Sequence, residues 1–346
     1  MNEVRIAIVG MGIGKPNARA MSNNSRGRIV ALCDIQEERM QDFAKELPEP
    51  IKFYTDYKKM CQDPEIDAVF VGTPNQLHVP IALEVVRNDK HVMVTKPLAD
   101  SVAAAQSLVE AAEAAGVVNM MSLSTRFDPR VQHLGGLIAQ NEMGELYYAR
   151  ARSVRRSGIP YWNMGFIREG GGAFRDMGVH VLDSAWWLLG RPKPVSVTGV
   201  AGAKFGPRGQ GYWHYSVPDK EIYQQYAADD YAGGFIRFEN GAGLQVESFW
   251  ASHQPEELQI ELFGTESGAT LNPLMMYRTV NGAPQDIAIN IPRYERGQSW
   301  DVIAGHFIDC IADGVPCEAP LRHGLIVQEM MEALLESGQS GREVVL

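Results

Sequence analysis

The stretch VRIAIVGMGIG, residues 4–14, decides the fold of the amino-terminal part of this chain. Apart from Arg5, its first six residues are apolar, and glycines follow at Gly10, Gly12 and Gly14. An apolar run that leads directly into a glycine-rich turn is typical of a buried strand at the start of a βαβ unit. The first glycine permits a tight bend, and the second lets the backbone approach a pyrophosphate at the positive end of the next helix. The stretch therefore predicts a dinucleotide-binding turn.

The turn departs from the dinucleotide fingerprint GxGxxG, which places its third glycine at position 15, where this sequence has Lys15. Gly14 can still allow close approach one residue earlier. Asp34 strengthens the interpretation because it ends the next apolar run, where an acidic side chain accepts hydrogen bonds from the adenosine ribose hydroxyls. Its carboxylate would repel a 2′-phosphate, so the sequence favours NAD over NADP. The alternative is that Asp34 only caps a helix beginning at Ile35.

Buried strands alternate with helical patterns over the first third of the chain. Strands are predicted at residues 4–9, 28–33, 68–71, 91–94 and 117–121. The clearest helix covers residues 101–115, with Ser101 as its cap and Gly116 as its stop. Parallel strands need such helical crossovers, so the alternation predicts an α/β Rossmann domain that ends near residue 122.

The remainder, residues 123–346, is predicted to form an α+β domain with an open, mainly antiparallel sheet. Its predicted strands cover residues 146–154, 195–200, 233–238, 243–250 and 258–263. Its predicted helices cover residues 130–140, 173–189, 300–312 and 324–335, of which the last two could also pack on the first domain. The segment 204–234 is rich in Gly and Tyr and lacks periodicity, so it is predicted to be a long loop.

The composition excludes several classes of protein. The net charge of −10 argues against nucleic acid and anionic membranes as partners, because both require clustered cations. No apolar run approaches the roughly 18 residues of a membrane-spanning helix, and the amino terminus is predicted to be a strand and not a signal peptide. The four cysteines, with no CxxC spacing and no export signal, predict free buried thiols and a cytoplasmic location.

Two motifs follow predicted strands, Gly72-Thr73-Pro74-Asn75 and Thr95-Lys96-Pro97. Ligands of open α/β sheets bind outside the carboxyl ends of the strands, which is where both motifs lie. A single lysine at a strand end is ordinarily a solvated surface residue. Here the following proline fixes the chain direction, which favours a Lys96 that points into the ligand cleft.

The tract GGGAFRDMGVHVLD, residues 170–183, carries Asp176 and His180 four positions apart on a predicted helix. Residues at this spacing share one helix face. Oxidation of a carbinol requires removal of the hydroxyl proton, and histidine titrates near neutrality, so these two residues with Lys96 could form a proton-transfer group opposite a nicotinamide. The alternatives are a hydrogen-bonded core or surface histidine, or a pair of metal ligands. No third Cys or His lies at a recognisable ligand spacing, so no metal is expected.

Together these motifs resemble the Gfo/Idh/MocA family of sugar and polyol dehydrogenases over nearly the whole chain. The matching motifs are the glycine turn, Asp34, Thr73-Pro74-Asn75 with His78, Lys96-Pro97, Arg126-Phe127 with Pro129, and the tract with Asp176 and His180. The resemblance implies a Rossmann domain followed by a sheet domain that makes oligomer contacts, and hence a homodimer or homotetramer.

The resemblance also implies roles for individual residues. Lys96 would orient or protonate the reacting oxygen, His180 would act as general acid or base, and Asp176 would support His180 and bind a substrate hydroxyl. The residues expected along the cofactor are Gly10, Gly12, Ile13, Gly14, Asp34, Ile35, Thr73, Pro74, Asn75, His78, Thr95, Lys96, Pro97 and Arg126. Arg126 is expected near the nicotinamide end or the substrate. A cis peptide bond between Lys96 and Pro97 would fit the family.

One departure concerns position 95, where the family usually has Glu-Lys-Pro and this chain has Thr95. Without the neighbouring carboxylate, the ammonium form of Lys96 loses a favourable charge or the nicotinamide contacts change. The preferred direction of the reaction therefore stays open.

Aromatic side chains in loop-like stretches could bind the faces of a sugar, although core packing or subunit contacts would explain them equally well. They are Tyr161, Trp162, Tyr212, Trp213 and His214, of which Trp162 is assigned to the substrate site with Lys96, Arg126, Asp176 and His180. The arginines at 152, 155 and 156 are interpreted as a solvated face or salt-bridge partners. The preferred substrate is a neutral monosaccharide, anhydrosugar, glycoside or inositol. Two alternatives remain, a glycosidase that recycles its NAD and a non-catalytic dinucleotide sensor.

Overall fold

The computed structural model describes residues 3–48, 50–291 and 298–346, and these form two compact units. The first unit comprises the described parts of Met1–Phe127 and Glu295–Gln328, and the second those of Asp128–Tyr294 and Glu329–Leu346. The chain therefore returns to the first unit after it has built most of the second. A division into domains at residue 122 stays a prediction.

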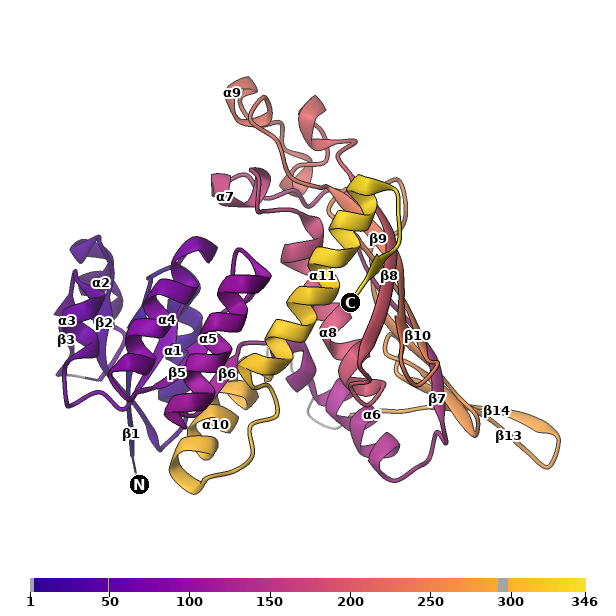
Figure 1. Ribbon diagram of the computed structural model, residues 1–346, viewed down its shortest axis with the longest axis horizontal. Helices are drawn as coiled ribbons and strands as arrows, with labels where there is room; N and C mark the ends of the chain where they lie inside the picture. Colours follow the sequence, from indigo (N-terminus) through magenta and orange to yellow (C-terminus); the bar gives the residue numbers. More distant parts are fainter. Residues whose placement is uncertain (1–2, 49, 292–297) are drawn as a thin grey trace. The chain divides into compact units, whose positions relative to one another are not determined.

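A parallel six-stranded sheet forms the centre of the first unit (Figure 1). Its strands are β1 (Val4–Val9), β2 (Gly27–Cys33), β3 (Lys52–Tyr54), β4 (Ala68–Val71), β5 (His91–Val94) and β6 (Asn119–Met121). The order β3-β2-β1-β4-β5-β6 confirms the predicted Rossmann topology. It reverses between β1 and β4, and ligands of such sheets bind outside the carboxyl ends of the strands at this point. The sequence missed β3, which has three largely exposed residues and no apolar run.

The helices of the first unit cover this sheet and supply its crossovers. They are α1 (Gly14–Asn23), α2 (Glu37–Ala44), α3 (Tyr57–Cys61), α4 (His78–Arg87), α5 (Val102–Ala115) and α10 (Gln298–Asp313), with the short turns η1 (Asn75–Leu77) and η2 (Ser124–Phe127). Helix α5 has the predicted ends. The Ser101 side chain accepts a hydrogen bond from the Ala104 N–H, and Gly116 closes the helix at a left-handed φ of 65°.

The second unit is built on a nine-stranded sheet of order β14-β13-β12-β11-β7-β10-β9-β8-β15. Its strands are β7 (Leu146–Val154), β8 (Pro194–Gly202), β9 (Tyr231–Phe238), β10 (Gly243–Phe249), β11 (Glu257–Gly264), β12 (Ser267–Thr270), β13 (Met275–Val280), β14 (Ala283–Ala288) and β15 (Val344–Val345). All neighbours are antiparallel except β7 and β10, which confirms a mainly antiparallel sheet. The sequence missed β12 to β15, which are short or mostly exposed.

Helices cover one face of this sheet and leave the other face open. The turn η3 (Phe174–Gly178, π-helical), α8 (Val179–Leu188) and, from Glu329 onward, α11 (Leu321–Ser340) pack on the sheet, and α6 (Pro129–Ala139) packs on α8. Helices α7 (Met164–Ile167) and α9 (Lys220–Tyr223) lie in loops beyond the sheet. Figure 1 shows α8 and α11 on the same side of the sheet. Gly199 and Gly234 let α11 approach closely, because a Cβ on either would lie 2.9 Å from the Leu334 side chain.

The segment 204–234 is partly a loop and partly a strand. Three short helices, η4 (Gly206–Arg208), η5 (Trp213–Tyr215) and α9, interrupt it, and it closes onto the sheet where buried Asp230 accepts hydrogen bonds from the N–H groups of Lys204, Phe205 and Gly206. The loop prediction was wrong for residues 231–234, which belong to β9, whereas the predicted strand 233–238 lies within β9. Glycines in this strand hide the strand pattern but permit the close packing of α11.

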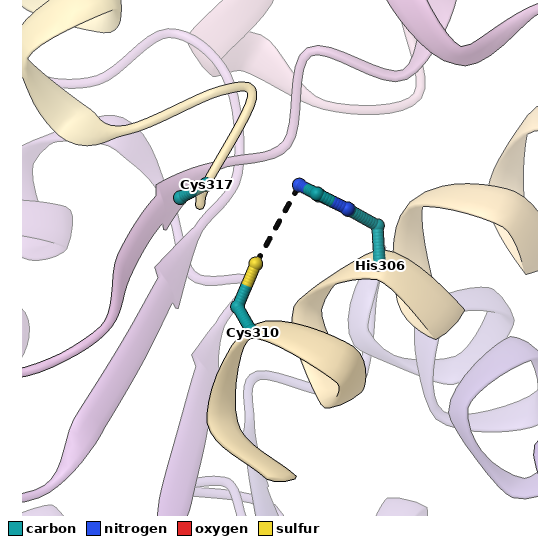
Figure 2. A group of neighbouring side chains, drawn as sticks. All are labelled: His306, Cys310 and Cys317. Atoms are coloured by element: carbon teal, nitrogen blue, oxygen red, sulfur yellow. Dashed lines mark hydrogen bonds between the residues drawn. The ribbon is translucent and has the colours of Figure 1, made fainter. Parts of the chain in front are cut away.

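All four cysteines are free thiols. Cys33, Cys61 and Cys310 are buried, as predicted, whereas Cys317 is only half-buried. Burial raises the pKa of both Cys33 and Cys61 to about 12. Cys310 lies on α10 one turn from His306, and Cys317 lies in the loop that follows α10 (Figure 2). Among the helices of the described residues, none is long and apolar enough to span a membrane.

Candidate active site

The three glycines of the amino-terminal turn have three different surroundings. Gly10 has a φ of 90°, and a Cβ there would lie 2.5 Å from the Gly72 carbonyl oxygen. A Cβ on Gly14 would lie 2.7 Å from the Ile8 side chain, so Gly14 lets α1 pack closely on β1. Around Gly12, in contrast, no atom of the described residues lies within 4 Å of the Cβ position. The turn is thus packed on two sides and open at Gly12.

Helix α1 begins at this open side of the turn. Within the described structure, no side chain caps its first N–H groups, and its first turn carries no acidic residue. The positive end of the helix dipole favours an anionic group here, although the Lys15 N–H already donates to the Gly12 carbonyl oxygen at 3.4 Å and Pro16 has no N–H. The turn and helix together therefore suit a pyrophosphate.

Asp34 ties the end of β2 to the glycine turn. Its carboxylate accepts a hydrogen bond from the Met11 N–H at 2.7 Å and a second from the Gln36 N–H at 3.0 Å. Helix α2 begins only at Glu37, so Asp34 does not cap a helix at Ile35. The Ile35 side chain is instead 87% exposed and offers an apolar surface beside the carboxylate.

Arg39 is the nearest cation to Asp34. Its guanidinium lies 3.9 Å from the Asp34 carboxylate and donates a hydrogen bond to the Met11 carbonyl oxygen. The cation is therefore paired with the acid that would repel a 2′-phosphate.

His78 joins the two strand-end loops. It is fully buried, and its ring nitrogens lie 2.7 Å from the Thr73 carbonyl oxygen and 2.8 Å from the Pro97 carbonyl oxygen. Burial lowers the pKa of His78, and the two carbonyl groups oppose this shift. Because a neutral imidazole carries one N–H, it can donate to only one of the two oxygens. His78 therefore lies behind both loops and holds one of them by a donated hydrogen bond, either to Thr73 or to Pro97.

Both strand-end loops carry polar groups at the predicted site. The Thr73 hydroxyl is buried and has no hydrogen-bond partner among the described residues, as expected for a group that a ligand satisfies. Lys96 is half-buried, and the Lys96-Pro97 peptide bond is cis, which fits the family resemblance. Thr95 is buried, and its N–H donates to the Val71 carbonyl oxygen.

Arg126 is fully buried, and it forms hydrogen bonds with residues of the first unit. Its guanidinium donates to the Glu318 carbonyl oxygen and lies 3.0 Å from the His323 ring. It thereby holds η2 against the loop before α11. A contact of Arg126 with cofactor or substrate stays a prediction.

Asp176 and His180 lie where the π-helical turn η3 passes into α8, and both are half-buried. The Asp176 carboxylate accepts a hydrogen bond from the Trp250 indole N–H at 3.0 Å. π-helical turns inside α-helices are frequent at functional sites, because the extra residue changes the direction of the side chains. The indole holds one Asp176 oxygen, so the orientation of this carboxylate is fixed from the sheet side.

Arg155 also belongs to the surroundings of Asp176, although its sequence position predicted a solvated or salt-bridged arginine outside the site. Burial lowers the pKa of Arg155, and the charges of Asp176 and Glu256 oppose this shift. Its guanidinium stacks over the Trp213 ring at 4.9 Å. Arg152 does form the predicted salt bridges, to glutamates of β11. The position in the sequence distinguishes Arg155 from Arg152, because Arg152 lies within β7 and Arg155 comes one residue after β7 ends.

Asp229 fixes the start of this helical tract. Its carboxylate accepts a hydrogen bond from the Phe174 N–H at 3.0 Å. Gly172 adopts a φ of 116°, and a Cβ there would collide with the Asp229 carboxylate. Burial raises the pKa of Asp229 to about 6. A glycine is therefore needed at position 172 for close contact with the Asp229 carboxylate.

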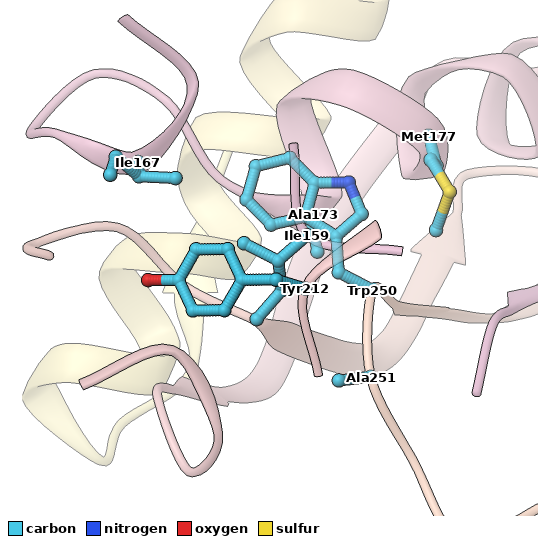
Figure 3. Close-up of a cluster of buried hydrophobic side chains, with 7 residues drawn as sticks. All are labelled: Ile159, Ile167, Ala173, Met177, Tyr212, Trp250 and Ala251. Atoms are coloured by element: carbon cyan, nitrogen blue, oxygen red, sulfur yellow. The ribbon is translucent and has the colours of Figure 1, made fainter. Parts of the chain in front are cut away.

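A buried cluster supports the aromatic loops of the second unit. It comprises Ile159, Ile167, Ala173, Met177, Tyr212, Trp250 and Ala251 (Figure 3). Trp162, outside the cluster, is 61% exposed and meets Trp213 edge to face at 5.5 Å between ring centroids. Trp162 and Trp213 therefore form an aromatic wall in the unit that carries Asp176 and His180.

Comparisons with known proteins agree over most of the chain. A model of the oxidoreductase family with an NAD-binding Rossmann fold matches residues 4–123, and a GFO/IDH/MocA C-terminal domain model matches residues 131–270. The D-glucoside 3-dehydrogenase of Escherichia coli (strain K12) is 28% identical over 99% of this chain and 97% of its own. The scyllo-inositol 2-dehydrogenase (NAD(+)) of Bacillus subtilis (strain 168) is 27% identical over 90% of this chain and 87% of its own.

Solved structures share the fold. Levoglucosan dehydrogenase, in complex with NADH and levoglucosan, aligns with a TM-score of 0.84 at 20% identity over 99% of each chain. At this identity the likeness concerns the fold alone.

Proposed function

Because the chain belongs to the Gfo/Idh/MocA family of NAD-binding oxidoreductases, we propose that it is a dehydrogenase acting on a neutral sugar or polyol. It transfers hydride between a carbinol carbon of a monosaccharide, anhydrosugar, glycoside or inositol and the nicotinamide. The observation that carries the proposal is the open glycine turn beside Asp34, because this pairing suits a dinucleotide that lacks a 2′-phosphate.

The residues of the first unit fit NAD in detail. The turn from Gly10 to Gly14 accepts the pyrophosphate at the start of α1, and Asp34 accepts hydrogen bonds from the adenosine ribose. Exposed Ile35 would offer an apolar surface to the adenine. The Thr73 hydroxyl, which has no partner among the described residues, would donate to or accept from the cofactor. His78 is buried behind the Thr73 and Pro97 loops and would support one of them, and through it the bound cofactor.

Bound NAD supplies the hydride acceptor or donor. His180 removes the hydroxyl proton of the substrate as the carbon is oxidised, and Lys96 donates a hydrogen bond to the same oxygen. Asp176, held by the Trp250 N–H, binds a neighbouring substrate hydroxyl and supports His180. The single proton released passes from the substrate oxygen to His180 and then to solvent.

The substrate class follows from the second unit and from the relatives. Trp162 and Trp213 offer aromatic faces to a sugar ring, and the Asp176 carboxylate accepts hydrogen bonds from hydroxyls. Two relatives act on a D-glucoside and on scyllo-inositol according to their names, and neither substrate is charged. Arg155 stacks on Trp213, and the charges of Asp176 and Glu256 favour its protonated form, so acids of this chain already accompany the cation.

We further propose a cytoplasmic homodimer or homotetramer formed through the open face of the nine-stranded sheet. Val200 is 61% exposed on that face, beside a shallow hollow of about 430 Å³. Its lining residues are Thr198, Gly199, Val200, Gly233, Gly234, Phe235 and Gln245. Free thiols support a reducing compartment. Light scattering of the purified chain and of V200K tests the assembly.

The function is tested by incubating the enzyme with NAD and a panel of D-glucosides, inositols and levoglucosan, and by following the absorbance of NADH. A dehydrogenase forms NADH in proportion to the oxidised sugar. Cleavage of a glycoside without net NADH would replace the proposal with a self-recycling glycosidase. Tight NAD binding with no turnover of any panel member would indicate a sensor.

A further inference from the structure

A cluster of three metal-binding side chains lies in the first unit, apart from the residues assigned to the dinucleotide. His306 and Cys310 are one turn apart on α10, and Cys317 lies in the following loop (Figure 2). One ligand atom from each residue lies within 4.8 Å of the other two. The His306 Nε2 atom lies 3.5 Å from the Cys310 sulfur, and the Cys317 sulfur lies 3.5 Å from the Asn119 carbonyl oxygen.

The three ligand atoms are already close to the spacing of a metal site. With Zn–S bonds of about 2.3 Å and Zn–N bonds of about 2.0 Å, tetrahedral ligand atoms are roughly 3.5 to 3.8 Å apart. Because the ligand atoms lie within 4.8 Å of one another, a contraction of at most about 1.0 to 1.3 Å reaches these values. Because Cys317 is on a loop, a shift of this size needs no change in the helix.

The chemistry of the donors selects the metal. Two sulfurs and one imidazole nitrogen suit zinc, whereas calcium and magnesium require oxygen ligands, and the cluster contains no carboxylate. Cys33 and Cys61 serve as a contrast, because they are buried in the same unit but belong to no such group among the described residues.

We propose that His306, Cys310 and Cys317 bind one zinc ion and that a water molecule completes the tetrahedron. Both thiols lose their protons to solvent as the ion binds, so no oxidation is involved. The ion joins α10 to the loop that follows it. With three protein ligands the site keeps one open position, and the proposed mechanism, which uses Lys96, Asp176 and His180, does not involve it.

The zinc site bears on Arg126 through one peptide group. The Glu318 N–H donates to His306 Nε2 at 2.9 Å, and the Glu318 carbonyl oxygen accepts the Arg126 guanidinium. Zinc would use the same His306 Nε2 lone pair that now accepts the Glu318 N–H, so that hydrogen bond would be lost. The bond between zinc and Cys317 would connect the loop to α10 in its place. The loop that holds Arg126 stays attached to α10 in either state.

The full chain, reduced and treated with a chelator, is titrated with cobalt(II) and then with zinc(II), without NAD or substrate. We expect thiolate-to-cobalt charge-transfer absorption, its loss as zinc displaces cobalt, and about one zinc per chain in competition with a chromogenic chelator. Zinc should also slow alkylation of half-buried Cys317, as mapped by peptide mass spectrometry. Absence of the charge-transfer band in the reduced wild-type chain overturns the proposal.

The variants C317S and H306Q should each lower the zinc affinity by on the order of 100-fold, whereas C61A should not change it. C61A is the matched control because it removes a buried thiol of the same unit and leaves the cluster intact. Zinc affinities of C317S and H306Q equal to that of the wild type would also overturn the proposal. The wild-type cobalt spectrum keeps the test valid if a variant fails to fold.

Discussion

At the scale of single residues, Asp34 has two tasks that one carboxylate can perform together. One oxygen accepts the Met11 N–H and the other the Gln36 N–H, and each oxygen has a further lone pair for a ribose hydroxyl. The residue therefore shapes the turn and selects the cofactor. Its position after a strand was visible in the sequence, whereas its bond to Met11 was not.

The variant D34S should lower kcat/KM for NAD by about 10- to 100-fold, because charge-assisted hydrogen bonds contribute about 1.5–3 kcal/mol. The same change should raise the use of NADP, since the repulsion of the 2′-phosphate disappears and Arg39 loses its partner. Steady-state kinetics with both cofactors measures the effect. E37Q removes a neighbouring exposed charge and serves as the control. An unchanged preference for NAD would contradict the assignment.

Lys96 and His180 are predicted to act directly on the reacting oxygen. K96M and H180N should each lower kcat by about 10²- to 10⁴-fold, the range typical of general acid–base groups. NAD affinity should stay within about threefold in H180N, and thermal unfolding should report that the variants are folded. H133N, which alters a histidine on α6, is the matched control. Full turnover in both variants would refute the proposed mechanism.

At the scale of elements, the contact between α1 and β1 separates packing from binding. Gly14 touches Ile8, whereas Gly12 faces open space, although the two glycines are only two residues apart. The missing third glycine of the fingerprint is therefore replaced by Gly14, which provides the close packing of helix and strand.

G14A should destabilise the protein by about 1–3 kcal/mol, because the added methyl group overpacks the helix–strand contact. G12A should leave the free energy of unfolding within about 0.5 kcal/mol and weaken NAD binding, since its methyl group occupies the space of the pyrophosphate. Denaturant unfolding and NAD titration on both variants distinguish the two effects. The reverse pattern would show that Gly12 packs and Gly14 binds.

The tract that carries Asp176 and His180 depends on the protonation of Asp229. Burial raises its pKa from 3.8 to about 6. A raised acid pKa in the folded state contributes stability that is present below about pH 4 and is lost as the pH rises through about 6. The free energy of unfolding should therefore fall across this window relative to D229N, by up to about 3 kcal/mol.

Urea unfolding of the wild type and D229N at intervals between pH 4 and 7 measures this difference. D286N, on exposed strand β14, is the control and should follow the wild type. Parallel curves for wild type and D229N would contradict the raised pKa.

At the scale of the whole molecule, the first unit is assembled from two distant parts of the chain. Helix α10 contributes buried Ile303, Phe307 and Ile308 to it. Arg26, in the turn after α1, pairs with Asp309 and Asp313 of the same helix. A Rossmann domain cut at its sequence boundary would lack this cover.

A fragment of residues 1–127 should therefore populate a state with exposed apolar surface. The same fragment joined by a flexible linker to residues 298–328 should unfold cooperatively. Binding of a hydrophobic dye and the sharpness of urea unfolding compare the two fragments. Cooperative unfolding of residues 1–127 alone, with a free energy of unfolding equal to that of the joined fragment, would refute this view.

The features that the sequence alone determined are those with a local physical cause. Continuous apolar runs predicted β1, β4 and β5 with their observed bounds, and Ser101 and Gly116 marked the ends of α5 through capping and a left-handed φ. The glycine turn and Asp34 could be identified from the sequence because both directly follow apolar runs that form neighbouring strands.

Tertiary structure decided what depends on distant partners. The short strand β3 and β12 to β15 exist because neighbouring strands supply their hydrogen bonds, and their own side chains carry little pattern. Folding also brought Arg155 to Asp176 and Cys317 to His306 and Cys310. Each grouping contains residues from different elements, so the spacing of these residues along the chain could not predict that they lie close together. The cause of these groupings is the packing of loops against helices, which is decided only when each unit folds.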